Sequence, residues 1–96
     1  MIRHVVMFTY RADATAAQIE AIPRGLSRLP GLIPQIRRYE YGAGINPGNK
    51  DFVVVADFDS NADFVTYRDH PDHQAFIAEC ITPAVAERVA VQYLIS

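Results

Sequence analysis

Ile2-Arg3-His4-Val5-Val6-Met7-Phe8-Thr9-Tyr10 is the stretch of sequence that decides the fold. It is rich in β-branched and aromatic residues and contains neither glycine nor proline, so it predicts a first strand. Successive side chains of a strand point to opposite faces of its sheet. The residues of one face are His4, Val6 and Phe8, and those of the other face are Val5 and Met7. Apolar side chains therefore need cover on both sides of the strand.

Two later strands repeat this doubly apolar pattern. Residues 51–58 predict a third strand, with Phe52, Val54 and Phe58 on one face and Val53 and Val55 on the other. Residues 87–95 predict the last strand, whose single apolar face carries Val89, Val91, Tyr93 and Ile95. Helices can bury only one side of such a sheet, and a second copy of the chain is the simplest cover for the other side. We predict a homodimer in which two sheets pack face to face as an α/β barrel.

A first helix is predicted after the first strand. Thr15 and Gln18 have the spacing of a capping box, and apolar residues recur at helical spacing from Ile19 to Leu29. Pro23 and Gly25 interrupt this pattern, so a kink or an irregular turn is expected there. The sequence Leu29-Pro30-Gly31 predicts the end of the helix.

The second half of the chain repeats the order of the first half. A second strand is predicted over residues 35–41 and a connecting loop over residues 42–50, which contain three glycines and a proline. Ser60 or Asn61 caps a helix that extends to about Asp69, and a bent helical segment follows over residues 70–81. The order strand, helix, strand, strand, helix, strand predicts an α+β, ferredoxin-like βαββαβ sandwich, with residues 1–96 as a single domain.

Composition restricts the class of protein. The chain has 96 residues, 50% of them hydrophobic and 21% charged, with a formal net charge of −2, which disfavours a disordered tail or a nucleic-acid binder. No apolar run approaches the ~20 residues of a membrane span, and no signal peptide is recognisable. We expect a cytoplasmic protein. Cys80 is the single cysteine and is interpreted as a core residue rather than a nucleophile.

Residues 67–74 carry most of the chemistry that this chain offers. Pro71 disfavours helical geometry in His70 and suits the first turn of a new helix, so His70 should end one helix and His73 should begin the next. An imidazole with a pKa of roughly 6.5 can accept a proton near neutral pH, and the Tyr67 phenol can donate a hydrogen bond to a developing oxyanion. Such a pair suits enolisation and ring closure, which require neither metal nor organic cofactor.

Structural interpretations of the same residues stay open. His4 is either a buried histidine bonded to a backbone carbonyl or part of a ligand pocket, and Tyr67 can simply pack in the core. His70 is interpreted first as a helix-junction residue bonded to nearby backbone, with ligand binding as its functional role. Aspartates 69 and 72 and histidines 70 and 73 are residue types that can bind a metal ion, but their spacing is not an established zinc spacing. We predict no metal site.

Several stretches together resemble a known family. They are the opening residues 3–8, the turn at 29–34, the strand exit at 55–60, the segment 67–74 and the ending at 88–93. In this order they are similar to the stress-responsive dimeric alpha/beta barrel (Dabb) family, over nearly the whole chain. The resemblance implies a homodimer in which two four-stranded sheets build a barrel.

The family resemblance also implies candidate site residues. The family includes proteins of unknown activity, heat-stable plant proteins that assemble into rings, and a cofactor-free polyketide cyclase. In the cyclase branch, residues that match His73 and Tyr67 act as general base and carbonyl-binding group, and one that matches His4 lines the pocket. Leu26 and Phe52 stand where that branch has a tyrosine and a histidine, so the chain departs from the branch there.

The sequence thus predicts a homodimer that binds a small carbonyl or aromatic compound, and cyclises or isomerises it without a cofactor. His73 and Tyr67 are the candidate catalytic residues, and His4 and His70 the candidate ligand-binding residues. A non-catalytic stress or assembly protein is the first alternative. A cofactor-free monooxygenase, which would need an electron-rich phenolic substrate and oxygen, is the second.

Overall fold

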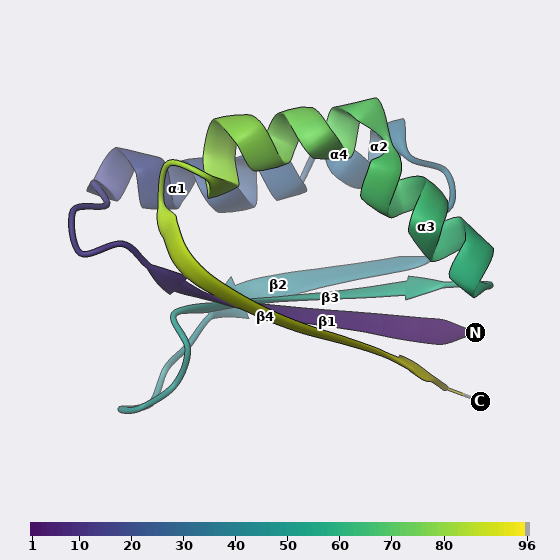
Figure 1. The fold of residues 1–96 in the computed structure, drawn as a ribbon, viewed down its shortest axis with the longest axis horizontal. Coiled ribbons are helices and arrows are strands. Elements are labelled where there is room, and N and C mark those ends of the chain that lie inside the picture. The colour runs from purple at the N-terminus through teal and green to yellow at the C-terminus, as the bar shows by residue number, and fades with distance from the viewer. Residues whose placement is uncertain (96) are drawn as a thin grey trace.

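The strands form one antiparallel sheet in the computed structural model, which describes residues 1–95. The spatial order of the strands is β2-β3-β1-β4, and their bounds are β1 Ile2–Tyr10, β2 Arg38–Ala43, β3 Phe52–Phe58 and β4 Val85–Leu94. All helices gather on one side of this sheet, and the two chain ends lie at the same end of neighbouring strands (Figure 1). The predicted ferredoxin-like α+β fold is confirmed.

Two strands differ from their predicted bounds because pairing, rather than composition, decides where a strand begins. β2 begins at Arg38 instead of residue 35. Arg38 lies opposite Asp57, and the antiparallel partner strand β3 ends at the next residue, so earlier residues of β2 have little of β3 left to pair with. β2 extends to Ala43 because Phe52 is available as a partner there. β4 begins at Val85 instead of residue 87, opposite Tyr10, and ends at Leu94.

Helix α1, Ala16–Leu26, begins with the predicted capping box: the Thr15 hydroxyl accepts from the Gln18 amide, and the Gln18 side chain accepts from the Thr15 amide. The expectation at its other end was wrong. The α-helix continues through Pro23 and Gly25 and stops at Leu26, and a short helix α2, Leu29–Leu32, then includes Pro30. Proline is tolerated at the start of α2 because the first amides of a helix have no partner within it.

The second helical region begins with α3, Asn61–Asp69, which Ser60 caps as predicted. His70 is extended and separates α3 from α4, Pro71–Phe76, which continues into a π-helical turn η1, Ile77–Ile81. The Thr82 amide donates to the Ile77 carbonyl across five residues. Within residues 1–95, no helix is both long and apolar enough to cross a bilayer.

The sheet has a buried inner face and an apolar outer face. Inner residues of β1 and β3, such as Val6 and Ala56, are buried beneath the helices. On the outer face, Val5 lies opposite Val55 on one side and Val91 on the other. The outer face also carries Met7, Val53, Val89 and Tyr93, and no helix within residues 1–95 covers it (Figure 1). The predicted doubly apolar sheet is therefore present.

Candidate functional site

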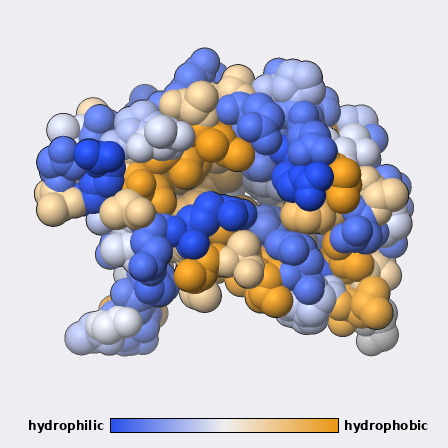
Figure 2. Space-filling model, viewed as in Figure 1, coloured by the Kyte–Doolittle hydropathy of each residue, from blue (hydrophilic) through white to orange (hydrophobic). Residues whose placement is uncertain are grey.

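A pocket lies between the inner face of the sheet and the α3–α4–η1 layer. It consists of an inner cavity of about 70 Å³ and an adjoining open cavity of about 280 Å³. Four residues line both cavities, namely His4, Tyr67, His73 and Arg88. The molecule is hollowed between helices and sheet on the face drawn in Figure 2, where hydrophobic and strongly hydrophilic residues both border the hollow. The inner cavity is otherwise apolar, with Val6, Phe8, Leu26, Val54, Phe76, Ile77 and Ile81 in its wall.

Three of the four predicted site residues meet in this pocket. The Tyr67 and His73 rings have centroids 4.1 Å apart, and the His4 and Tyr67 centroids are 6.2 Å apart. His70 is not among the lining residues of either cavity. Its Nδ1 accepts from the Asp72 amide at 3.1 Å, which makes His70 the N-cap of α4.

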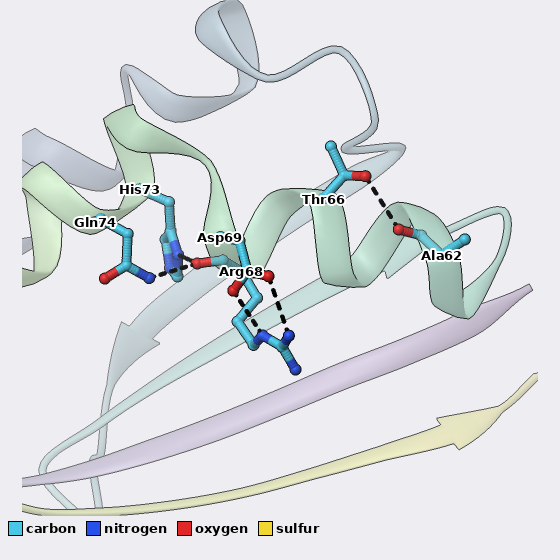
Figure 3. Close-up of polar contacts among 6 residues, drawn as sticks. All are labelled: Ala62, Thr66, Arg68, Asp69, His73 and Gln74. Carbon is cyan, nitrogen blue, oxygen red and sulfur yellow. Dashed lines mark hydrogen bonds and ion pairs between the residues drawn. The ribbon is translucent and has the colours of Figure 1, made fainter.

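The bend at Pro71 orients His73. Its Nδ1 lies 3.0 Å from the Arg68 carbonyl, which also accepts from the Gln74 side chain (Figure 3). A carbonyl only accepts hydrogen bonds, so Nδ1 carries the proton. Burial lowers the pKa of His73, which favours the neutral ring. The remaining nitrogen, Nε2, is then unprotonated and has no hydrogen-bond partner among residues 1–95.

His4 presents the opposite tautomer. The Gln92 side-chain nitrogen lies 2.8 Å from His4 Nδ1, and because an amide nitrogen only donates, Nδ1 is the acceptor and Nε2 carries the proton. Burial first, and then the charge of Arg88, lowers the pKa of His4 to about 4. His4 is therefore a neutral hydrogen-bond donor, and its ring packs 4.9 Å from that of Phe64. A side-chain amide, rather than the expected backbone carbonyl, satisfies it.

A second tyrosine supports Tyr67. The Tyr39 and Tyr67 hydroxyls are 2.6 Å apart; Tyr67 is buried and Tyr39 is half-buried. Burial raises the pKa of Tyr67 to about 12, and the hydrogen bond with Tyr39 acts in the opposite direction. Burial, followed by the charge of Tyr67 and the shared hydrogen bond, also raises the pKa of Tyr39, so both phenols are protonated at neutral pH. Either hydroxyl can donate within this pair, and when Tyr39 donates, the Tyr67 proton is available to a ligand oxygen.

Sheet register explains how these groups come together. Tyr39, Ala56, His4 and Gln92 form one row across the inner face, from β2 to β4. Ala56 is the small member of the row and is fully buried. Sequence reasoning missed Tyr39 and Gln92. The signal that could have identified them is the pairing register of the strands, which was not predicted. Leu26 lines the inner cavity, whereas Phe52 is absent from both linings.

Arg88 is the other residue that sequence reasoning left without a role. It lies on the inner face of β4, opposite Phe8, and alternation along the strand directs Glu87 to the outer face. Glu87 pairs with Lys50 at 2.9 Å. Arg88 takes part in none of the ion pairs within residues 1–95.

The aspartates of the 67–74 segment have structural partners. Asp69 pairs with the Arg68 guanidinium at 2.9 Å (Figure 3), and Asp72 lies 3.7 Å from His70 Nδ1. In the described part of the chain, no three histidine, cysteine or acidic side chains are grouped so that they could hold a metal ion. Aspartates 69 and 72 and histidines 70 and 73 therefore do not form the metal-binding group considered from the sequence.

Fold and pocket together define a ferredoxin-like α+β domain with a pocket between sheet and helices. The family model of the stress responsive A/B barrel domain, Dabb, matches residues 2–95, and this chain belongs to that family. Among curated proteins, no sequence matches the chain.

Solved structures place the chain among similar folds. A dimeric ferredoxin-like protein of unknown function from Thermobifida fusca YX is 45% identical, with 98% of this chain and 90% of that chain covered and a TM-score of 0.88. A Dabb family protein from Mesorhizobium loti MAFF303099 is 25% identical, with coverage of 99% and 96% and a TM-score of 0.82. A hydroxynitrile lyase from Passiflora edulis is 22% identical, with coverage of 99% and 93% and a TM-score of 0.86, a likeness of fold.

Proposed function

We propose that the protein is a homodimer that binds a small carbonyl or aromatic compound in this pocket, and cyclises or isomerises it without a cofactor. His73 Nε2 accepts a proton from the carbon next to the substrate carbonyl. The electron pair moves to the carbonyl oxygen, to which Tyr67 donates a hydrogen bond. In a cyclisation the enolate carbon attacks a second carbonyl of the same molecule, and His73 returns its proton to the alkoxide that forms there. In an isomerisation His73 returns the proton to a different carbon of the enolate.

The contact between Tyr67 and His73 is the observation that carries this proposal. Their ring centroids are 4.1 Å apart, both line the two cavities, and the Nδ1 contact with Arg68 leaves His73 Nε2 unprotonated. A base and an oxyanion donor within one pocket are the groups that enolisation requires. His4 adds a second donor to the same wall, which supports a role in ligand binding.

Two observations support the dimer. The outer sheet face exposes Met7, Val89, Val91 and Tyr93, a set of apolar side chains that a single chain leaves in water. The 45% identical protein from Thermobifida fusca is described as dimeric. Packing two such faces together removes this apolar surface from water.

A screen of small carbonyl and aromatic compounds tests the proposed activity. Ligand binding, product formation and thermal unfolding are measured on the wild type, on His73→Ala and on Tyr67→Phe. We expect both variants to fold and dimerise, and loss of the base to lower turnover by ~10² to 10⁴ fold. Tyr10→Phe is the matched control, because Tyr10 lies outside both cavity linings and should retain full turnover.

Equal ligand binding and equal turnover in all the proteins would contradict the assignment of His73 and Tyr67. Changes in melting temperature without any activity in the wild type would favour the non-catalytic alternative. Turnover that consumes oxygen and requires a phenolic substrate would instead identify a monooxygenase.

A further inference from the structure

Arg88 is an exposed residue of β4 whose side chain borders the pocket. It lines both the inner and the open cavity, together with His4, Tyr67 and His73. The walls of both cavities contain no aspartate or glutamate from the described part of the chain. A guanidinium is charged at any physiological pH. Arg68, which borders the open cavity, is paired with Asp69. Among residues 1–95, the pocket therefore combines one guanidinium that takes part in no ion pair, that of Arg88, with two neutral histidines.

The nearest acidic residue in sequence cannot neutralise Arg88. Glu87 faces the other side of the sheet and is bound to Lys50. Arg24 and Arg28 also take part in no ion pair within residues 1–95, but they border a separate groove beside Cys80. The charge of Arg88 acts on three groups of the site. It helps burial to lower the pKa of His4 and His73, and it opposes the rise that burial causes in the pKa of Tyr67. Each of these effects favours the state with more negative charge in the pocket.

The two cavities also differ in character. The inner cavity has about 70 Å³ and an apolar wall, which is room for about five to seven water-sized groups. The open cavity adds Phe64, Arg68, Ala90 and Gln92 to the residues that it shares with the inner one. A molecule that fits both has a short apolar end and a polar or charged end on the side of Arg88.

We infer that Arg88 binds a carboxylate of the ligand, so that the substrates of this pocket are small anionic carbonyl compounds with a short apolar end. This inference rests on the proposed function and names its substrate class. Arginine suits this role because its planar fork donates two parallel hydrogen bonds to a carboxylate. With the carboxylate at Arg88 and the apolar end in the inner cavity, the middle of the ligand passes between Tyr67 and His73, which line both cavities.

Hexanoate and hexanamide test the inference, because they share a short alkyl chain and differ in charge. Binding is followed at pH 7.5 by NMR titration of the wild type, Arg88→Gln, Arg88→Lys and Arg24→Gln. We expect the wild type and Arg24→Gln to bind hexanoate at least about tenfold more tightly than hexanamide. Arg88→Gln should bind both compounds equally, and Arg88→Lys should retain a smaller preference, since lysine keeps the charge without the fork.

Equal affinity of the wild type for the two compounds, or an unchanged preference in Arg88→Gln, would overturn the inference. Failure of the wild type to bind either compound would overturn it as well. The proposed function fails separately, since it requires turnover to fall in His73→Ala whatever the charge of the substrate. If Arg88→Gln lowers turnover while the wild type shows no preference for hexanoate, Arg88 stabilises an oxyanion and the carboxylate assignment is wrong.

Discussion

His73 should act as a base even at pH values below its ordinary pKa of 6.5. Burial lowers its pKa from 6.5, and only the unprotonated ring accepts a proton, so the reactive form predominates at neutral pH. We expect kcat/KM to rise with pH along an acid limb with a midpoint below 6.5, and to be level above it. A pH profile from 4 to 9 measures this. A midpoint above 6.5 would contradict the assignment of His73 as a buried neutral base.

His4 makes the stability of the fold depend on pH. Its pKa is lowered to about 4 in the folded chain, while the unfolded chain has the ordinary value of 6.5. Between these values the unfolded state binds more protons, so stability is full above pH 6.5 and falls as the pH falls toward 4. The loss is on the order of 3 kcal/mol.

Chemical denaturation of the wild type and of His4→Leu between pH 4 and 7.5 measures this dependence. The variant has no imidazole at this position, so its stability should vary less across the window. Equal pH dependence in the two proteins would show that His4 is not held neutral by the fold.

Local sequence could predict Tyr67 and His73 but not their partners. The bend at Pro71 and the residue types nearby indicated this segment, and the family resemblance selected these two residues within it. Tyr39 and Gln92 lie far from this segment in sequence and reach it only because β2 and β4 pair in a particular register. His70 has the same residue type as His73, but its backbone position at the start of α4 uses its Nδ1 as a cap.

At the scale of elements, Gly25 sets the approach of α1 to α4 and η1. A Cβ at this position would lie 2.5 Å from Cδ1 of Phe76 and 3.3 Å from Sγ of Cys80. Gly25→Ala should displace the Phe76 ring toward the inner cavity and destabilise the protein by about 1 to 2 kcal/mol, since overpacking outweighs the better helix propensity of alanine.

Gly31→Ala is the matched control for Gly25→Ala. No atom outside the neighbouring residues lies within 4 Å of a Cβ at Gly31, so this variant should be neutral or slightly more stable. Urea denaturation of both variants measures the difference. Equal stability of the two would show that the contact between α1 and Phe76 is not tight.

The junction of α3 and α4 gives a second element-scale prediction. His70→Ala removes the side chain that caps α4 and should cost about 1 kcal/mol, whereas His70→Asn keeps a capping group and should cost less. Thermal unfolding compares the two variants. If alanine and asparagine are equivalent here, the Nδ1 contact with the Asp72 amide contributes nothing to stability.

Elements could be predicted from sequence where the signal was local, and less well where it was not. Capping at Thr15 and Ser60 and the break at His70 depend on neighbouring residues, and the structure has all three. The ends of β2 and β4 depend on how far the partner strand extends, which local composition does not contain. The π-helical turn at residues 77–81 has no sequence signal that we recognised.

At the scale of the whole molecule, the outer sheet face should hold two chains together. Val55 lies in the middle of this face, on a central strand, between Glu40 of β2 and Val5 of β1. Val55→Lys places an ammonium in an apolar interface, where the neighbouring Glu40 carboxylate is already paired with Arg38, so removing the new charge from water should cost several kcal/mol and the variant should be monomeric. Light scattering or sedimentation at micromolar concentration measures the mass.

Thr66→Lys is the control for that substitution, because Thr66 is exposed on α3, on the helical side of the sheet. It should leave the dimer unchanged. A wild-type protein that is monomeric at micromolar concentration would contradict the interface. The doubly apolar strands made the apolar outer face predictable, whereas the shape of the pocket depended on helix packing that sequence alone did not provide.

The central claim is that the folded protein removes a proton next to a carbonyl with His73 and stabilises the resulting oxyanion with Tyr67. Incorporation of deuterium from heavy water into small ketones and keto acids tests it most directly, because it requires no knowledge of the product. We predict that the wild type accelerates exchange next to the carbonyl of at least one compound, that His73→Ala reduces this acceleration by ~10² to 10⁴ fold, and that Tyr67→Phe also reduces it. Exchange that is no faster with the wild type than without protein, or equally fast with all three proteins, would contradict the claim.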